Sequence, residues 1–310
     1  MNDGVFVAIL TSGLALSIPI LWAAVGEVIN ERAGILNIGI EGVMLFGAFA
    51  AAITLKGSDS FVLAFLVAVP VGLIAGAVLA WFYVTRGIDQ IVTGIIFNLF
   101  ALGVTTVLYN EFLTGAGQVR GIDGIDVPGL ADLPVIGPVL FDQTVVAYAA
   151  VVVAVLVFLL LNRTWLGLYL RGIGERPRAG ETAGLSVIRL RYIALLLGCP
   201  LVALGGATII VTQGGNFLPN VTSGQGFIAL AVVVLGRFNP LWIVAGAFLF
   251  GLSTALQFQA QNLGFLADLP AQLWLAMPYI VTIVAVVVAK GAQYPAATAI
   301  PYTKPGTAGP

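Results

Sequence analysis

The chain has 310 residues, of which 60% are hydrophobic and only 9% are charged, with a formal net charge of −1. A soluble domain carries about 25% charged residues, so this chain has too little charge to cover a globular surface. The composition excludes a soluble enzyme and predicts an integral membrane protein. It contains no histidine, which excludes a histidine proton relay and a histidine-ligated metal site.

Apolar segments recur along the chain at the length needed to span a membrane, about 20 residues for ~30 Å of hydrocarbon. They predict an all-α, polytopic helical bundle of about nine spans (eight to ten), forming a single membrane domain over residues 1–290. The first 31 residues hold no Lys or Arg, so we expect the first segment to remain as a membrane helix rather than to be cleaved as a signal peptide. The nine segments are 5–25, 34–55, 61–84, 90–112, 143–161, 192–212, 224–236, 240–258 and 271–289.

The seventh segment is too short for a straight crossing, because residues 222–235 extend only about 21 Å as a helix. It is either a tilted short span or a re-entrant element that lines a cavity. The basic residues favour a crossing. If all nine segments cross with the N-terminus outside, eleven basic residues are cytoplasmic and two, Lys56 and Arg120, are external, as the positive-inside rule requires. The linker 113–142 is then external, and a cytoplasmic tail over 291–310 is expected to be disordered.

A polar, glycine-rich segment, residues 26–42, joins the first two spans. Asn37 and Glu41 lie four residues apart, so a helix places them on one face. An embedded carboxylate costs roughly 2.5–3.5 kcal/mol, so Glu41 should face protein or a water-filled cavity. Two interpretations remain: both residues line a solute path, or Glu41 sits in a first helical turn, where the dipole favours an anion, and anchors packing. Apart from Glu41, we expect almost no carboxylate inside the bilayer.

The longest basic stretch, residues 163–191, carries six arginines and two glutamates. Pro177 suits the first turn of a short helix, and Gly184 can end it. A short surface helix between two spans can dock a cytoplasmic partner; the alternative is an ordinary positive-inside loop.

A third polar segment precedes the seventh span and contains the glycine-rich runs 213–216 and 222–227. Glycine-interrupted short spans point to a midplane binding site in transporters. Glycines within other spans, Gly206 among them, predict close packing of helix backbones, or hinges. The polar residues that could line a solute path are Asn37, Glu41, Asn98, Gln213, Asn216 and Gln225.

No G-x-x-x-x-G-K-[ST] motif occurs, so the chain cannot cradle ATP phosphates in a P-loop. We expect it to bind no cofactor and to have no catalytic residues. With few embedded ionisable groups to couple an ion gradient, the energy for transport should come from a partner.

Three motifs resemble one family of membrane proteins. Residues 27–44 (EVINERAGILNIGIEGVM) resemble the start of permease subunits of ABC importers in the branched-chain amino acid, simple-sugar and nucleoside superfamily, closest to the nucleoside and simple-sugar branch. Residues 172–187 resemble its cytoplasmic coupling loop, and 226–236 followed by Asn239-Pro240 resemble its segment near the last spans. Two departures lie in the loop: Glu175-Arg176 stands where Glu-Asn is common, and Gly180 replaces an alanine, which weakens a helix by roughly 1 kcal/mol.

The resemblance implies a permease in the bacterial cytoplasmic membrane with its C-terminus cytoplasmic. Its partners would be ATPase subunits that bind ATP and Mg²⁺, a second permease, for which a paralogue is expected, and an extracytoplasmic solute-binding protein, besides membrane lipid and without nucleic acid. The residues implied to contact the ATPase are Gly174, Glu175, Arg176, Pro177, Arg178, Ala179, Glu181, Ala183 and Gly184.

The resemblance also implies a small polar solute, for which we predict a nucleoside. A sugar or a branched-chain amino acid is the next alternative. An ion-coupled secondary carrier would use similar glycine-rich breaks, and transport by the isolated chain would distinguish it.

Overall fold

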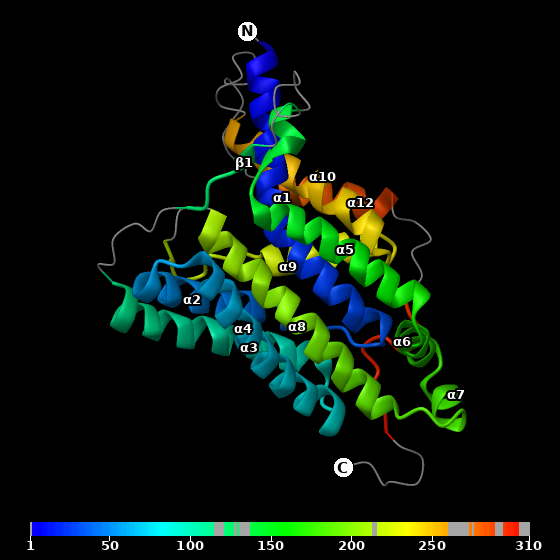
Figure 1. The fold of residues 1–310 in the computed structure, drawn as a ribbon. Coiled ribbons are helices and arrows are strands. Elements are labelled where there is room, and N and C mark those ends of the chain that lie inside the picture. Colours follow the sequence, from blue (N-terminus) through cyan, green and yellow to red (C-terminus); the bar gives the residue numbers. More distant parts are fainter. Residues whose placement is uncertain are drawn as a thin grey trace.

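The computed structural model describes residues 2–114, 121–126, 129, 137–212, 216–259, 273–274, 276–288 and 294–303. Within them the chain is a bundle of α-helices (Figure 1). The helices are α1 (Asn2–Arg32), α2 (Ile40–Ser58), α3 (Phe61–Ala80), α4 (Gln90–Leu108), α5 (Val145–Arg163), α6 (Trp165–Glu175), α7 (Pro177–Thr182), α8 (Val187–Thr212), α9 (Gln225–Leu235), α10 (Pro240–Gln259) and α12 (Met277–Val288). The described residues also include three short π-helical segments: η1 (Trp81–Thr85) after α3, η2 (Tyr109–Leu113) after α4, and η3 (Gly137–Phe141) before α5. The strands β1 (Ile125–Asp126) and β2 (Asp142–Gln143) form one antiparallel pair.

Seven helices in the described part of the chain are long and apolar enough to cross a membrane. They coincide with the first six predicted segments and with the eighth, which confirms the prediction of an all-α, polytopic bundle. Their bounds, with the π-helical turns included, are Gly4–Arg32, Ile40–Ser58, Phe61–Thr85, Gln90–Leu113, Val145–Arg163, Val187–Thr212 and Pro240–Gln259.

The other two predicted segments contain shorter helices. α9 has 11 residues and is therefore about 16 Å long, well short of the ~30 Å hydrocarbon core. α12 has 12 residues. Whether α9 crosses the membrane fully stays a prediction.

The junction of α1 and α2 differs from the expectation. α1 continues to Arg32 instead of ending near residue 25, and α2 begins at Ile40 instead of residue 34. Gly34 ends the first helix because its φ of +79° is left-handed, a conformation that glycine adopts at little cost. Residues 33–39 thus form a turn, and the polar residues before it belong to α1.

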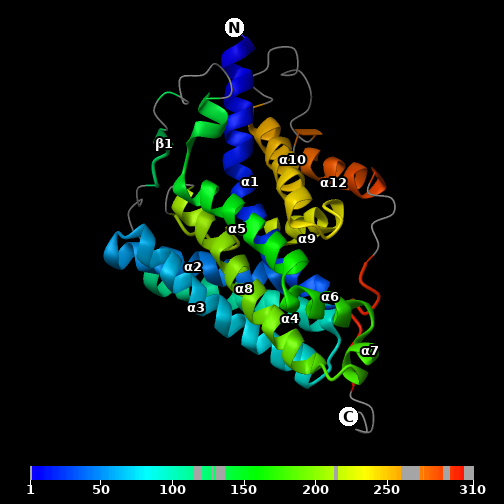
Figure 2. The same cartoon turned by 45° about the vertical axis from the view of Figure 1, so that its right-hand side comes forward.

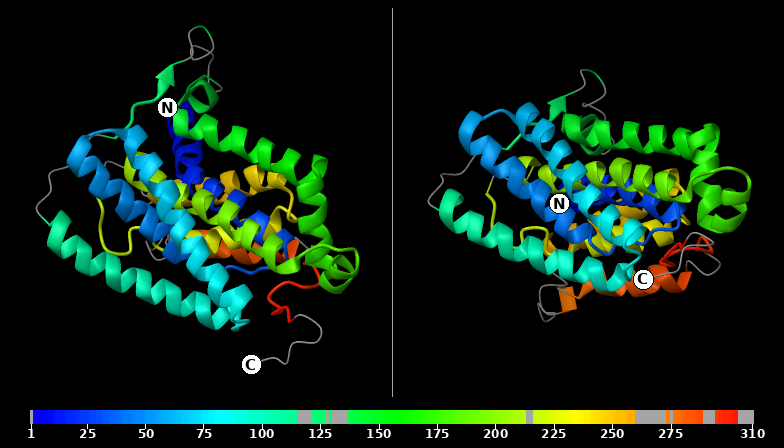
Figure 3. Two further views of the ribbon diagram at one scale, coloured as in Figure 1. Left: turned by 60° about the horizontal axis from the view of Figure 1, so that its bottom comes forward. Right: turned by 90° about the horizontal axis from the view of Figure 1, so that it is seen from below.

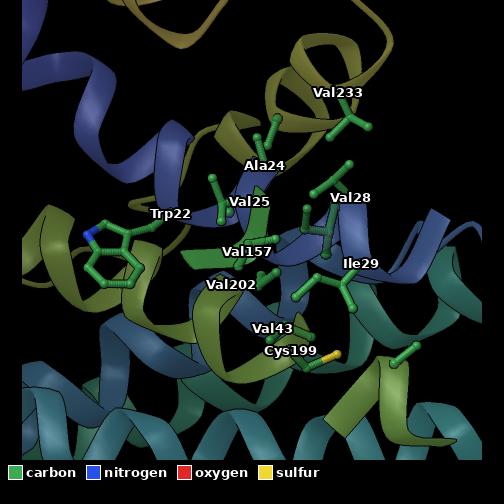
Figure 4. Close-up of a cluster of buried hydrophobic side chains, with 14 of the residues drawn as sticks. Trp22, Ala24, Val25, Val28, Ile29, Val43, Val157, Cys199, Val202 and Val233 are labelled. Atoms are coloured by element: carbon green, nitrogen blue, oxygen red, sulfur yellow. The ribbon is translucent and has the colours of Figure 1, made fainter. Parts of the chain in front are cut away.

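α8 lies inside the bundle and packs against α1, α2 and α3. Seen from below, α4 and α5 run along opposite sides with α1 and α8 between them (Figure 3). The main core gathers small and branched apolar residues from these inner helices. Figure 4 shows Val28 and Ile29 of α1 in the same cluster as Cys199 of α8. Cys199 is fully buried and unpaired.

The two ends of the bundle differ. α6, α7 and residues 294–303 lie at one end, whereas the start of α1, β1 and η3 lie at the other (Figures 1 and 2). The sequence predicted a disordered tail over 291–310, yet residues 294–303 form turns with defined hydrogen bonds to α6 and α8. These contacts join residues more than 100 positions apart, so local composition did not indicate them.

Candidate functional site

A buried polar network surrounds the turn between α1 and α2. Glu27 accepts hydrogen bonds from the Asn30 side chain and from the backbone N–H of Asn37, both at 2.9 Å. The Asn37 side chain accepts one from Tyr83 at 3.3 Å and points its amide nitrogen at Cys199 Sγ, 3.7 Å away. Asn37 is fully buried; its backbone N–H contacts α1, and its side chain contacts η1 and α8.

Two residues of α4 hold the same turn from another side. The Asn98 side chain accepts from the backbone N–H of Gly42 at 2.8 Å and donates to the carbonyl of Ile38 at 2.9 Å. Gln90 accepts from the N–H of Leu36 at 2.8 Å. Each of these backbone groups lies outside regular helical pairing, so the amides provide the partners that buried backbone needs in a membrane.

α1 contributes two buried carboxylates, which corrects the expectation that Glu41 stands almost alone. Glu27 and Glu31 are both 0% exposed. Glu27 has the partners just described, whereas neither carboxylate oxygen of Glu31 has a hydrogen-bond partner in the described residues. Neither residue was predicted to lie in a membrane helix, because the first apolar segment ends before residue 27 and both residues fall in the polar segment 26–42.

Glu41 connects two helices that are far apart in the sequence. Its carboxylate accepts three hydrogen bonds: from the Thr222 hydroxyl at 2.5 Å and from the backbone N–H groups of Gly224 at 2.8 Å and Gly226 at 2.7 Å. The side chain is 7% exposed. It thus occupies the N-terminus of α9, where free N–H groups and the helix dipole favour an anion.

Glycine allows this approach. A Cβ atom on Gly226 would lie 2.8 Å from the Glu41 Cα, and Gly224 has a left-handed φ of +85°. The structure therefore gives Glu41 a packing contact with α9 in addition to its place in the first turn of α2. Both polar glycine-rich segments that the sequence singled out meet at this carboxylate.

The remaining candidates for a solute path are dispersed. Asn216 is exposed and lies apart from the buried network around Asn37. Gln213 lies outside the described residues. Gln225 lines a pocket of about 450 Å³ between α1, α9, α10 and α12, together with Gln257 of α10. Nothing in the local sequence around Gln257 indicates that it faces a cavity, so it was not among the predicted solute-path residues.

The basic stretch 163–191 contains two helices. α7 begins with Pro177 and Gly184 follows its end with a φ of +85°, as predicted. α6 was not predicted; it buries Leu170 and Ile173 and exposes Trp165. Of the nine residues proposed for partner contact, Gly174 is buried, and Pro177 and Glu181 are half-buried. The other six are exposed: Glu175, Arg176, Arg178, Ala179, Ala183 and Gly184.

Packing explains why a glycine stands at position 180, where the family pattern has an alanine. A Cβ atom there would lie 3.0 Å from Cγ2 of Ile173, which is tighter than ordinary contact. The glycine lets α7 lie directly on α6. Gly174 is closer still, since its Cβ would lie 2.1 Å from the carbonyl oxygen of Arg32. α6 therefore presses against the end of α1.

Residues 294–303 bind the same region. The N–H of Ala297 donates to the carbonyl of Gly174 at 2.9 Å, and the buried Arg191 guanidinium donates to the carbonyl of Ile300 at 3.0 Å. The Tyr302 hydroxyl donates to Glu181. Burial and this carboxylate raise the pKa of Tyr302 to about 12, so the phenol stays protonated and can donate.

Comparison with known proteins identifies the type of molecule. Residues 9–286 match the family described as Branched-chain amino acid transport system / permease component. The chain belongs to this family. It is a multi-pass permease component of a transport system, a transport subunit rather than an enzyme, and the resemblance inferred from the sequence motifs is confirmed. Permeases of ABC transporters generally work with ATPase and binding-protein partners and typically bind no cofactor.

Individual relatives cover most of this permease. It is 33% identical to the Nucleoside ABC transporter permease protein NupC of Lactococcus lactis and 32% identical to the Guanosine ABC transporter permease protein NupQ of Bacillus subtilis, each over 96% of both chains. It is 33% identical to the Putative glucose ABC transporter permease protein TsgC13 of Haloferax volcanii, over 80% of this chain and 76% of the relative. No solved structure matches.

Proposed function

We propose that this permease forms half of the path by which an ATP-driven importer carries nucleosides across the bacterial cytoplasmic membrane. The observation that carries the proposal is the end-to-end similarity to relatives named for nucleosides and guanosine. The relative named for glucose keeps a sugar as the second candidate.

The same proposal assigns sides to the bundle. α6, α7 and the tail are cytoplasmic, and the start of α1 with the linker 113–142 is external. The excess of arginine in 163–191 supports this by the positive-inside rule. The arrangement agrees with it, because β1 and η3 lie at the opposite end from α7 (Figure 2).

Partners follow from these sides. ATPase subunits, which bind ATP and Mg²⁺, would dock on the exposed residues of α7 and of the segments next to it. A binding protein would deliver solute to the external linker. A second permease, a paralogue of this chain, would complete the path. This chain itself performs no covalent chemistry and binds no nucleotide.

A contact route joins the proposed docking helix to the polar turn. Gly174 at the end of α6 touches Arg32 at the end of α1, Glu27 of α1 holds Asn37 of the turn, and Glu41 after the turn holds α9. Each link is a close backbone contact or a hydrogen bond with little freedom. We infer that an ATPase-driven shift of α7 moves α9 through these links.

Uptake measurements test the transported solute. Cells that lack this gene should lose uptake of labelled nucleosides and keep uptake of labelled glucose and leucine. Unchanged nucleoside uptake would contradict the nucleoside proposal. Ion-driven transport by the reconstituted chain alone, without an ATPase, would instead favour a secondary carrier.

Substitutions on the docking surface test the coupling role. Glu175→Arg reverses an exposed charge, and Ala183→Trp adds bulk to an exposed position with ordinary backbone geometry. We expect each variant to reduce ATPase co-purification and solute uptake at least about tenfold, the effect of losing roughly 1.4 kcal/mol of binding, while thermal stability stays unchanged.

Matched controls separate docking from internal contacts. Glu175 also accepts a hydrogen bond from the N–H of Ala296 at 3.3 Å, and Glu175→Gln keeps that acceptor. Ala183→Ser adds little volume. Both controls should retain ATPase binding, and normal ATPase association of Glu175→Arg and Ala183→Trp would show that the partner docks elsewhere.

A further inference from the structure

The pocket between α1, α9, α10 and α12 combines apolar side chains with several uncharged polar ones. Its volume of about 450 Å³ falls within the ~300–1,000 Å³ typical of small-molecule sites. It lies beside the N-terminal turn of α9, which Glu41 holds from the other side. Its lining consists of Leu16, Ile20, Val221, Ser223, Gln225, Ile228, Thr254, Gln257, Phe258, Pro278, Tyr279 and Thr282.

No charged side chain occurs among these described lining residues. The free N–H groups of a short helix can bind the carboxylate of a substrate, but here Glu41 already accepts from Gly224 and Gly226. An anionic or zwitterionic solute therefore finds neither a counter-charge nor a free helix terminus. The pocket suits an uncharged polar molecule, which favours a nucleoside or a sugar over an amino acid or a nucleotide.

The polar groups of the pocket have unused hydrogen-bonding capacity. The Gln225 Oε1 atom has no partner in the described residues but is itself buried, so the Gln225 amide must turn to present this oxygen to a ligand. The hydroxyls of Thr254 and Thr282 donate to carbonyls of their own helices, at 3.1 and 2.7 Å, so their oxygens remain available as acceptors. Unpaired polar groups are expensive inside a bilayer, which indicates a polar occupant.

Two aromatic rings accompany the amides. Phe258 and Tyr279 line the pocket, and the described residues leave 64% and 72% of them uncovered. Aromatic side chains stack on nucleobases, and glutamine and asparagine amides pair with base edges through two hydrogen bonds. Gln225 and Gln257 bring such amides from two different helices.

We propose that this pocket holds the nucleobase of a solute in transit, with Gln225 and Gln257 pairing with its edge and Tyr279 and Phe258 stacking on its face. The inference rests on the proposed nucleoside transport and adds which chemical part of the solute is recognised. It also makes α9, which Glu41 positions, one wall of the binding site.

The test uses the complete transporter, with its ATPase and partner permease, reconstituted in proteoliposomes with a labelled purine nucleoside. Gln257→Leu and Tyr279→Ala should each raise the KM for uptake about tenfold, the effect of losing one paired or stacked contact. Tyr279→Phe keeps the ring and should transport normally. Competition by free base should weaken in the variants, whereas competition by ribose should stay as it is in the wild type.

Matched threonines control for general damage to a helix. Thr254→Val removes a hydroxyl from the pocket, and Thr106→Val removes one from α4 that makes the same bond to the carbonyl four residues earlier, Leu102, at 2.7 Å. Only Thr254→Val should raise the KM. If the wild-type complex transports nucleosides and the pocket variants keep its KM, this inference fails alone. If the wild-type complex transports no nucleoside, the proposed function fails with it.

Discussion

Replacing Glu41 with alanine should destabilise the permease and abolish transport. The substitution removes the acceptor of three hydrogen bonds, from Thr222, Gly224 and Gly226, and leaves two backbone N–H groups without a partner. An unsatisfied buried polar group costs about 1–3 kcal/mol, so the expected loss is at least ~3 kcal/mol. The apparent melting temperature of the purified protein in detergent should fall by several degrees, and uptake should be lost.

Two further variants distinguish the effect of losing the Glu41 charge from the effect of losing its side chain or any carboxylate. Glu41→Gln keeps one acceptor oxygen but turns an NH₂ donor toward N–H donors, so it should be intermediate in stability. Glu111→Ala removes an exposed carboxylate from η2 and should behave as wild type. If Glu41→Ala kept full stability and changed only the KM for solute, Glu41 would line the solute path rather than anchor α9.

The sequence predicted most of the helices because a membrane span is recognisable from a local run of apolar residues. It also predicted α7, because Pro177 and Gly184 mark both ends through local backbone preferences. It failed at the end of α1. Glu27, Asn30 and Glu31 look like loop residues in isolation. The bonds of Glu27 with Asn30 and with the distant Asn37 provide partners for a buried carboxylate, and local sequence does not reveal the second of them.

The sequence predicted the segments that form the site, but not how they contact one another. Both glycine-rich segments were identified, but the contact between Glu41 and Thr222 spans 181 positions, and no periodicity encodes it. The pocket was missed for a related reason. Gln225 and Gln257 belong to different helices, and only the packing of α9 on α10 turns them toward one cavity. A single polar residue in an apolar run cannot indicate which neighbour it faces.

The closest contact between two helices in the core joins α2 and α8, and we expect its disruption to have the largest effect on stability. α2 and α8 approach through two glycines, one from each helix. A Cβ atom on Gly206 would lie 1.8 Å from the carbonyl oxygen of Met44, and one on Gly47 would lie 2.1 Å from that of Ala203. Both obstacles are backbone atoms, which cannot rotate away. These contacts confirm that Gly206 serves close packing, the drive for helix association in lipid.

Gly206→Ala should therefore force the two helices apart and disrupt the core. Overpacking costs about 1–3 kcal/mol and sometimes more, and backbone obstacles put this case at the upper end. We expect little monodisperse protein by size-exclusion chromatography in detergent and no uptake. Gly103→Ala provides the matched control, because no atom beyond its own stretch of α4 lies within 4 Å of its Cβ position and alanine favours a helix. Equal yields of the two variants would mean that α2 and α8 do not pack as closely as this contact requires.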